Sequence, residues 1–366
     1  MNRRFVLFVA TGSPGNIRPM LAAARACTAR GLPAICASNP LWERWIRSHG
    51  VQWRALPQHV EAHITHGARY PDTSEGQVRR SSVASLRMAL RDRMERDSAR
   101  QAFHILIEDV ALVVHHATLQ RIRGLSEAVG VPALGVSRTG TMSLPPRERR
   151  SPSLYAAAPA FLGADVVQSP LEKVCGEWLL PTDSTLPAPL DRFVRVNQPY
   201  IIVTHGAFLG SAASHVARTA VVAAHGLGMR VLALMPSDTT YLQSNPETLV
   251  WHYGLHHDAV IAGAACVVHP GGAGTTHRSA RAGVPSLPIP LHESDVYWAE
   301  RAFRVQLTST LLDSATLSVA TVSDALAHTT TNVTYRYNSR ALALQMAQEH
   351  GLEQLIAVIR PYLGSP

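Results

Sequence analysis

The sequence has few cysteines and no long apolar segment. The four cysteines, Cys27, Cys36, Cys175 and Cys266, are scattered along the 366 residues. They form no CxxC pair and no metal-ligand spacing, and most lie in apolar runs, so we expect reduced core residues and no metal site. No apolar run reaches the roughly 18 residues that a membrane-spanning helix needs. These absences favour a cytoplasmic protein without disulfides.

Charge is also sparse, and it is unevenly divided. Charged residues make up 16% of the chain and aromatic residues 6%, while the formal net charge is +8. A basic excess suits nucleic acid, an anionic membrane surface or a phosphate-bearing ligand. The most basic stretch, residues 79–100, contains acidic and apolar side chains near helical spacing and no aromatic residue. We therefore expect an amphipathic helix there and no nucleic-acid partner, and we leave a peripheral membrane contact open.

The apolar pattern alternates between strands and helices in both halves of the chain. A strand over Phe5–Ala10, a glycine turn, a helix over Ile17–Arg30 and a strand over Pro33–Ala37 form a βαβ opening. The same rhythm restarts with a strand at Tyr200–Thr204, after a proline-rich linker over Pro181–Pro189. A chain of 366 residues exceeds the size of one ordinary core. We predict an α/β protein with two Rossmann-like domains, each a doubly wound parallel sheet, facing a cleft.

One glycine-rich loop can bind a phosphate-bearing ligand. Ala264–Val268 has the pattern of a buried strand, and His269-Pro270-Gly271-Gly272-Ala273-Gly274-Thr275-Thr276 follows it. Glycines let the backbone approach a ligand closely, and the N-terminus of the next helix favours a diphosphate. We expect His269 and a threonine hydroxyl to add hydrogen bonds, with Thr275 or Thr276 capping the helix.

This loop and its surroundings resemble the donor-binding segment of family 1 glycosyltransferases, especially bacterial antibiotic, sterol and rhamnolipid enzymes. The similarity continues through Ala282-Gly283-Val284-Pro285 and Trp298-Ala299-Glu300-Arg301, and Gly12–Met20 is similar to the family's first loop and helix. The resemblance implies the GT-B fold. In that fold residues 1–185 would form the acceptor-side domain and residues 190–340 the domain that binds the donor. Residues 341–366 would cross back to the first domain.

The resemblance also implies a reaction and a set of donor contacts. A hexose would move from a UDP- or dTDP-linked sugar to a hydroxyl of a small hydrophobic acceptor, with inversion and without a metal or other cofactor. No Asp-x-Asp motif occurs, and the histidine doublets lack a third metal ligand at a recognisable spacing. The residues implied to bind the donor are Gly206, Leu255, His269, Gly271, Gly272, Gly274, Thr275, Thr276 and Asp295.

The sequence departs from the family pattern at the position of the catalytic base. The family places His or Asp where this chain has Asn16, and an amide cannot accept a proton at neutral pH. We expect Asn16 to be the N-cap of a helix beginning at Ile17. His115 and His116 follow a predicted strand and could reach the cleft, so the catalytic candidates are His116, His115 and Asn16. A structural role at the end of the strand is the alternative for both histidines.

Two further departures affect the substrates. The family's Asp-Gln pair, which meets sugar hydroxyls, is replaced by Ser294-Asp295. The connection between Val136 and Ser153 is short where related enzymes have a longer segment, which predicts a reduced acceptor pocket. With Asn16, these departures suit a catalytically silent relative that activates another glycosyltransferase. A nucleotide-sugar epimerase would need carboxylates in the cleft, and the sequence has no clear set.

Overall fold

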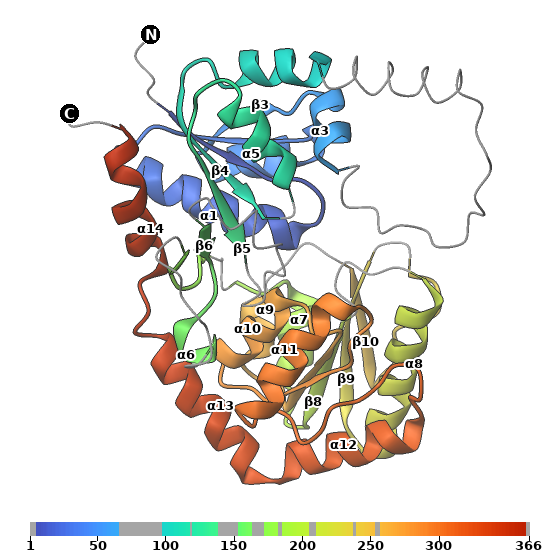
Figure 1. The fold of residues 1–366 in the computed structure, drawn as a ribbon. Helices are drawn as coiled ribbons and strands as arrows, with labels where there is room; N and C mark the ends of the chain where they lie inside the picture. The colour runs from blue at the N-terminus through green and yellow to red at the C-terminus, as the bar shows by residue number, and fades with distance from the viewer. Residues whose placement is uncertain are drawn as a thin grey trace, which may run out of the picture.

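The protein forms two parallel β-sheets, each with helices on both faces (Figure 1). The computed structural model describes residues 5–65, 97–117, 119–137, 153–162, 172–181, 185–204, 210–236, 239–252 and 257–363. The first sheet has the order β3-β2-β1-β4-β5-β6-β7 and the second β10-β9-β8-β11-β12. This architecture confirms the predicted α/β fold with two doubly wound sheets.

Every strand in the described residues pairs in parallel. The central strands are continuous apolar runs because both of their faces are buried. The first sheet consists of β1 (Phe5–Val9), β2 (Ala34–Ser38), β3 (Gln52–Ala55), β4 (Val110–His116), β5 (Ala133–Ser137), β6 (Ser153–Tyr155) and β7 (Glu172–Val174). The second consists of β8 (Tyr200–Thr204), β9 (Arg230–Met235), β10 (Thr248–His252), β11 (Cys266–His269) and β12 (Ser286–Pro288).

Helices cover the first sheet on both faces. One apolar cluster joins a face of the sheet to α1 (Pro14–Ala29) and α14 (Gly351–Ile359). A second cluster joins the opposite face to α3 (Gln58–Thr65), to α5 (Gln120–Glu127) and to the helical residues 97–106. The remaining short elements of this region are η1 (Pro40–Trp42), α2 (Glu43–Ser48) and η3 (Arg360–Leu363).

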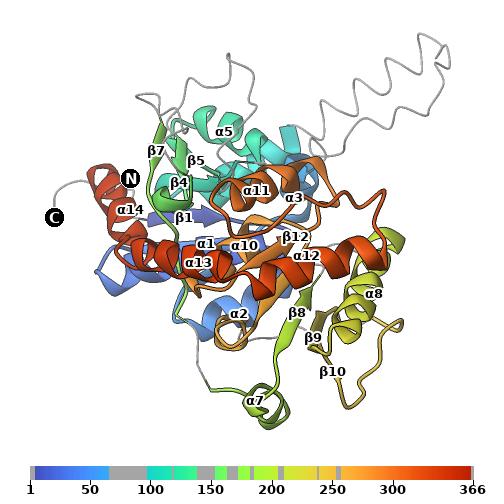
Figure 2. The same cartoon turned by 90° about the horizontal axis from the view of Figure 1, so that it is seen from below.

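The second sheet is covered in the same way. On one face lie α8 (Ser211–Gly226) and α12 (Val319–Thr331), and on the other α7 (Ala188–Arg195) and α9 (His257–Ile261). The helices α10 (Ala273–Arg281), α11 (Glu293–Arg304) and α13 (Val333–Met346) complete this half. Figure 2 shows α12 and α13 following one another across the molecule toward α14, which lies on the first half beside α1.

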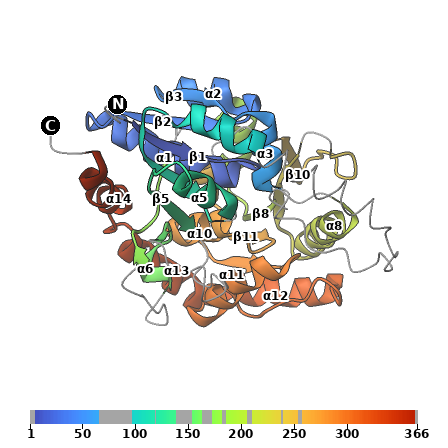
Figure 3. The same cartoon turned by 45° about the horizontal axis from the view of Figure 1, so that its top comes forward.

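A short segment that follows β6 of the first sheet packs among helices that belong to the second sheet. Phe161 and Leu162, in α6 (Pro159–Leu162), are buried in one cluster with residues of α10, α11 and α13, and Figure 3 shows α6 against α13. Arg301 donates to the Phe161 carbonyl at 3.2 and 2.9 Å, and the Ala158 N–H donates to His277 Nε2 at 3.3 Å. The two sheets are therefore joined by a packed, hydrogen-bonded contact.

Each sheet has a topological switch point, where strands are added first on one side of the first strand and then on the other. In the first sheet this switch lies between β1 and β4, and in the second it lies between β8 and β11. Ligands of doubly wound folds bind at the carboxyl ends of the strands at such points, because the loops on the two sides diverge there. The loop before α1 follows β1 at one switch point, and the glycine-rich loop follows β11 at the other.

Two helices begin earlier than the sequence indicated. α1 begins at Pro14 with Ser13 as its N-cap, because proline suits the first turn of a helix. The expectation that Asn16 is an N-cap is therefore wrong, and its amide instead donates to the Thr11 carbonyl at 3.3 Å. α10 begins at Ala273 with Gly272 as its N-cap, so neither Thr275 nor Thr276 is a cap.

Two other expectations lie outside the described residues. They are most of the basic stretch over residues 79–100 and the connection between Val136 and Ser153. Among the helices that the structure describes, none is both long and apolar enough to cross a membrane.

Candidate active site

The glycine-rich loop makes a tight turn at the end of β11. Gly271 has a φ of +90°, a conformation that costs other residues about 1 to 2 kcal/mol. Its N–H donates to His269 Nδ1 at 3.0 Å. A Cβ atom on Gly271 would lie 2.8 Å from the Asp295 carbonyl oxygen, whereas one on Gly272 would meet nothing within 4 Å. Gly271 is thus required by the turn and by the neighbouring α11, while Gly272 leaves the N-terminus of α10 open.

His269 is the polar side chain at the base of this turn. It is 0% exposed, and burial lowers its pKa to about 3, so the imidazole is neutral. Because Nδ1 accepts the Gly271 N–H, the ring proton is assigned to Nε2. Among the described residues, Nε2 has no hydrogen-bond partner. His269 therefore holds the loop through Nδ1, and its Nε2 donor is enclosed without a partner among the described residues.

Two substitutions of His269 separate its support of the loop through Nδ1 from a ligand contact through Nε2. His269→Ala should weaken UDP or dTDP binding by about 1 to 3 kcal/mol, the usual effect of losing a hydrogen bond to a charged group. In His269→Asn the Oδ1 atom can still accept the Gly271 N–H, but the Nε2 donor is lost. Calorimetry with both nucleotides measures the effect, and unchanged affinity in both folded variants would contradict a ligand contact by His269.

The other threonine and glycine candidates of the loop differ in accessibility. Thr276 is buried, and its hydroxyl donates to the Gly272 carbonyl at 3.0 Å within the first turn of α10. Gly274 and Thr275 are half-buried in the same turn. Gly206 and Leu255 lie outside the described residues. The described donor candidates therefore share one short segment, with Thr276 supporting the helix.

Asp295, in the first turn of α11, lies against the glycine loop. The residue is 4% exposed, and burial raises the pKa of its carboxyl group to about 6, although the charge of His292 and two backbone amides oppose this shift. Its Oδ2 atom has no hydrogen-bond partner among the described residues. A buried acceptor without a donor is costly, so the enclosed Oδ2 atom destabilises the fold at this position.

The cost of ionising Asp295 predicts a pH-dependent stability difference. A carboxyl whose pKa is higher in the folded than in the unfolded state destabilises the fold above that pKa and has no effect below the unfolded value near 3.8. Asp295→Asn should therefore be about 1 to 3 kcal/mol more stable than the parent chain at pH 7 to 8, and equally stable below about pH 4. Urea unfolding at the two pH values measures this, and a pH-independent difference would contradict the burial of an ionisable group.

The two adjacent histidines of β4 point to opposite faces of the first sheet. Side chains alternate along a strand, and Val113 packs in the cluster with α5 whereas Leu112 and Val114 pack in the cluster with α1. His115 follows the first pattern and is 1% exposed, with a pKa lowered to about 4 mainly by burial. His116 is half-buried and follows the second pattern, toward the helix that carries Asn16.

The three catalytic candidates therefore do not lie on the same side of the sheet. His115 is placed on the α5 side, where its side chain is enclosed and its Nδ1 lies 3.0 Å from the His116 carbonyl oxygen. His116 ends β4 at the switch point, and Asn16 lies in the first turn of α1 beside it in the sheet order. Of the three candidates, His116 and Asn16 are therefore brought to the same edge of the sheet.

Relatives of the chain are found among antibiotic and sterol enzymes. The glycosyltransferase GtfC and the vancomycin aglycone glucosyltransferase, both from Amycolatopsis orientalis, are 29% and 30% identical over 177 and 171 residues. Each match covers 45% of this chain and 41% of the relative, less than half of the relative's length. A sterol 3-beta-glucosyltransferase from Eremothecium gossypii is 21% identical over 95% of this chain and 33% of its own. No family model matches the chain.

Solved structures match over the full length. The calicheamicin glycosyltransferase CalG4 superposes with a TM-score of 0.73 at 15% identity, covering 100% of this chain and 99% of its own. The chain has the GT-B glycosyltransferase fold. The glycosyltransferase VinC, solved in complex with dTDP, also has this fold. It superposes with a TM-score of 0.69 at 17% identity, covering 98% of this chain and 99% of its own.

The protein also has a cluster of charged residues between the first and the second sheet domain, which the sequence did not indicate. Arg278 of α10 pairs with Asp258 of α9 at 3.3 Å. Arg18 of α1 has its pKa lowered to about 10 by burial and by the charge of Arg278, with Asp258 opposing. Arg18 therefore lies near enough to the Arg278–Asp258 pair for its guanidinium to feel both charges. The three residues come from distant segments, so no local motif could have revealed the cluster.

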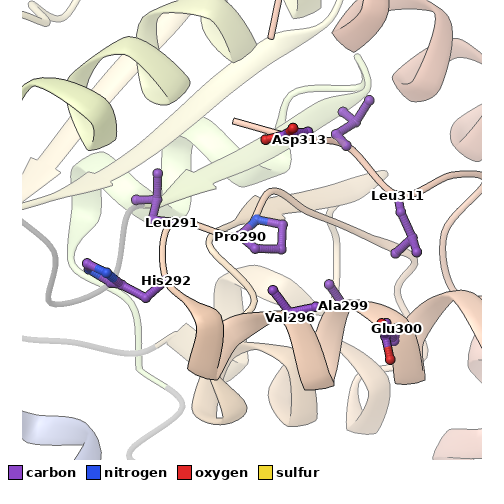
Figure 4. A pocket seen from close by; sticks show the side chains of 9 residues that line it. Pro290, Leu291, His292, Val296, Ala299, Glu300, Leu311 and Asp313 are labelled. Carbon is purple, nitrogen blue, oxygen red and sulfur yellow. The ribbon is translucent and has the colours of Figure 1, made fainter. Parts of the chain in front are cut away.

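A pocket of about 300 Å³ is lined by residues of α11 and of the loops beside it. Figure 4 shows Val296 and Ala299 of α11 beside Pro290, with Leu311 and Asp313 on the neighbouring loop. None of the glycine-loop residues lines this pocket. Within the described ranges, no three His, Cys, Asp or Glu side chains are grouped as a metal site.

Proposed function

We propose that this protein is a glycosyltransferase that moves a hexose from a nucleoside-diphosphate sugar to a hydroxyl of a small hydrophobic acceptor. The observation that carries the proposal is the glycine loop at the switch point of the second sheet, where the N-terminus of α10 is open beside His269. The relatives are named glycosyltransferases, and one fold neighbour was solved with dTDP. UDP and dTDP sugars are therefore the donors that we propose.

We propose an inverting reaction without a metal. The acceptor oxygen would attack the anomeric carbon while the bond from that carbon to the diphosphate oxygen breaks, and the diphosphate would keep the electron pair. His116 would take the acceptor's proton, and Asn16 would orient the hydroxyl. The N-terminus of α10, the Nε2 donor of His269 and the arginines Arg18 and Arg278 would stabilise the departing charge.

The domain organisation and setting that accompany this function are also proposals. We propose residues 1–185 as the acceptor-side domain, residues 190–340 as the donor-binding domain and residues 341–366 as the return to the first domain. The packing of Leu355, Ile356 and Ile359 with residues of α1 supports the last assignment. We propose that the protein acts in the cytoplasm.

The decisive experiment incubates the purified protein with UDP- and dTDP-sugars and measures both binding and slow donor hydrolysis. Micromolar to millimolar binding together with hydrolysis would support a transferase. Binding without hydrolysis or transfer to any acceptor would indicate a silent relative that activates another enzyme. Absence of binding to every nucleotide would overturn the proposed function.

A further inference from the structure

Helix α13 exposes a stripe of large apolar side chains. Val333, Tyr337 and Leu344 are 80%, 72% and 72% exposed, while Leu342 and Met346 of the same helix face the core. At about 100° per residue, the three exposed side chains lie within an arc of about 40° around the helix. Figure 2, seen from below, shows α13 along the outside of the molecule. Single apolar side chains are ordinary on a protein surface, but three in one stripe indicate a surface that a partner covers.

The charged residues of α13 are all cationic. The helix contains Arg336 and Arg340 and no aspartate or glutamate. Arg340 is exposed and lies about 20° from Val333 around the helix, so it borders the apolar stripe. Arg336 lies on the same flank, where its guanidinium donates to the Ala264 carbonyl at 3.1 Å. The stripe is therefore accompanied by positive charge, in a chain whose formal net charge is already +8.

An anionic membrane surface fits these features better than a second copy of the chain. In a symmetric contact between two copies the stripe would face itself, and two copies of Arg340 would be brought together at an electrostatic cost. A bilayer that contains anionic lipids instead attracts arginine and accepts apolar side chains at the boundary of the headgroups, where tyrosine is also favoured. The long arginine side chain can keep its charge among the headgroups while its apolar neighbours are inserted.

We propose that α13 docks the protein on an anionic membrane surface, with Val333, Tyr337 and Leu344 inserted and Arg340 among the headgroups. The helix has 14 residues and a length of about 21 Å, so it can lie in the plane of the surface. The contact would hold the protein at a lipid surface, where hydrophobic molecules concentrate. It is independent of the proposed function, because none of the glycine-loop residues takes part in it.

Flotation of the full chain with lipid vesicles measures this contact. The unmodified chain should float with vesicles of phosphatidylcholine and phosphatidylserine in a ratio of about 7 to 3, and bind phosphatidylcholine alone about fivefold more weakly or less. Tyr337→Gln together with Leu344→Gln should lower the partition coefficient for the anionic vesicles by about tenfold to a hundredfold. Arg340→Gln should lower it by about fivefold. Leu41→Gln, which removes a leucine that is 77% exposed outside α13, should leave it within about twofold.

A fluorescent label tests the same contact without removing the stripe. The four cysteines of the chain are buried, so an environment-sensitive fluorophore reacts selectively with the exposed thiol of Leu344→Cys. Its emission should shift to the blue when the anionic vesicles are added, because the label enters the apolar boundary of the bilayer. The same label on Leu41→Cys should show no shift.

Three results would overturn the membrane contact. The first is failure of the unmodified chain to float with the anionic vesicles. The second is binding that survives the double substitution, or an unshifted label at position 344, because another surface would then be responsible. The third is a dimer in sedimentation experiments that the double substitution dissociates while no vesicles are bound, which would make the stripe an interface between two copies. Loss of dTDP binding bears on the proposed function alone.

Discussion

Gly271→Ala should destabilise the protein by about 2 to 5 kcal/mol and abolish measurable dTDP binding. The residue has a φ of +90°, which an alanine adopts only at a cost of about 1 to 2 kcal/mol. The added Cβ would also lie 2.8 Å from the Asp295 carbonyl oxygen, a backbone atom of α11 that cannot move without shifting the helix. Relief of such overpacking costs a further 1 to 3 kcal/mol or so.

Gly272→Ala is the matched control for this change. Gly272 has a φ of −62°, and a Cβ there meets nothing within 4 Å, so its stability should change by less than about 1 kcal/mol. Urea unfolding of the two variants compares the free energies, and calorimetry with dTDP compares the sites. Equal stability of Gly271→Ala and Gly272→Ala would show that the turn and its contact with α11 are not as described.

His116→Gln should lower turnover by about 10² to 10⁴ while leaving donor affinity unchanged, if the protein transfers sugar as proposed. Removal of the acceptor's proton belongs to the transition state, so loss of the base reduces kcat without weakening nucleotide binding. Imidazole takes up a proton near neutral pH, whereas the Asn16 amide at the same edge of the sheet cannot. Turnover with saturating donor and calorimetry with dTDP measure the two quantities separately.

Two comparison variants make this test specific. His115→Gln should keep the turnover of its folded fraction, because that side chain is 1% exposed on the opposite face of the sheet. Asn16→Asp introduces a carboxylate at the start of α1 and should partly restore turnover to His116→Gln. Full turnover in His116→Gln would sink the assignment of the base, and so would a larger loss in His115→Gln than in His116→Gln.

The placement of the helix starts illustrates where local sequence patterns were ambiguous. Asn16 is a favourable N-cap, but Ser13 followed by Pro14 begins α1 earlier. Thr275 and Thr276 are good caps too, but Gly272 can take the extended conformation of a cap and α10 starts after it. The strands β12 and β10 are three and five residues long, too short for their apolar residues to show a periodicity.

The sequence by itself determined the α/β architecture with two sheets, a buried strand within residues 264–268 and the glycine turn after it. These features depend on local periodicity and on a backbone conformation that favours glycine, so a short window of sequence contains them. Only the tertiary structure decided that His115 and His116 face opposite ways, that Asp295 and His269 are buried beside Gly271, and that the charge of Arg278 acts on Arg18. Burial, side-chain direction and charge pairing depend on which distant segments pack together, and no local pattern specifies those contacts.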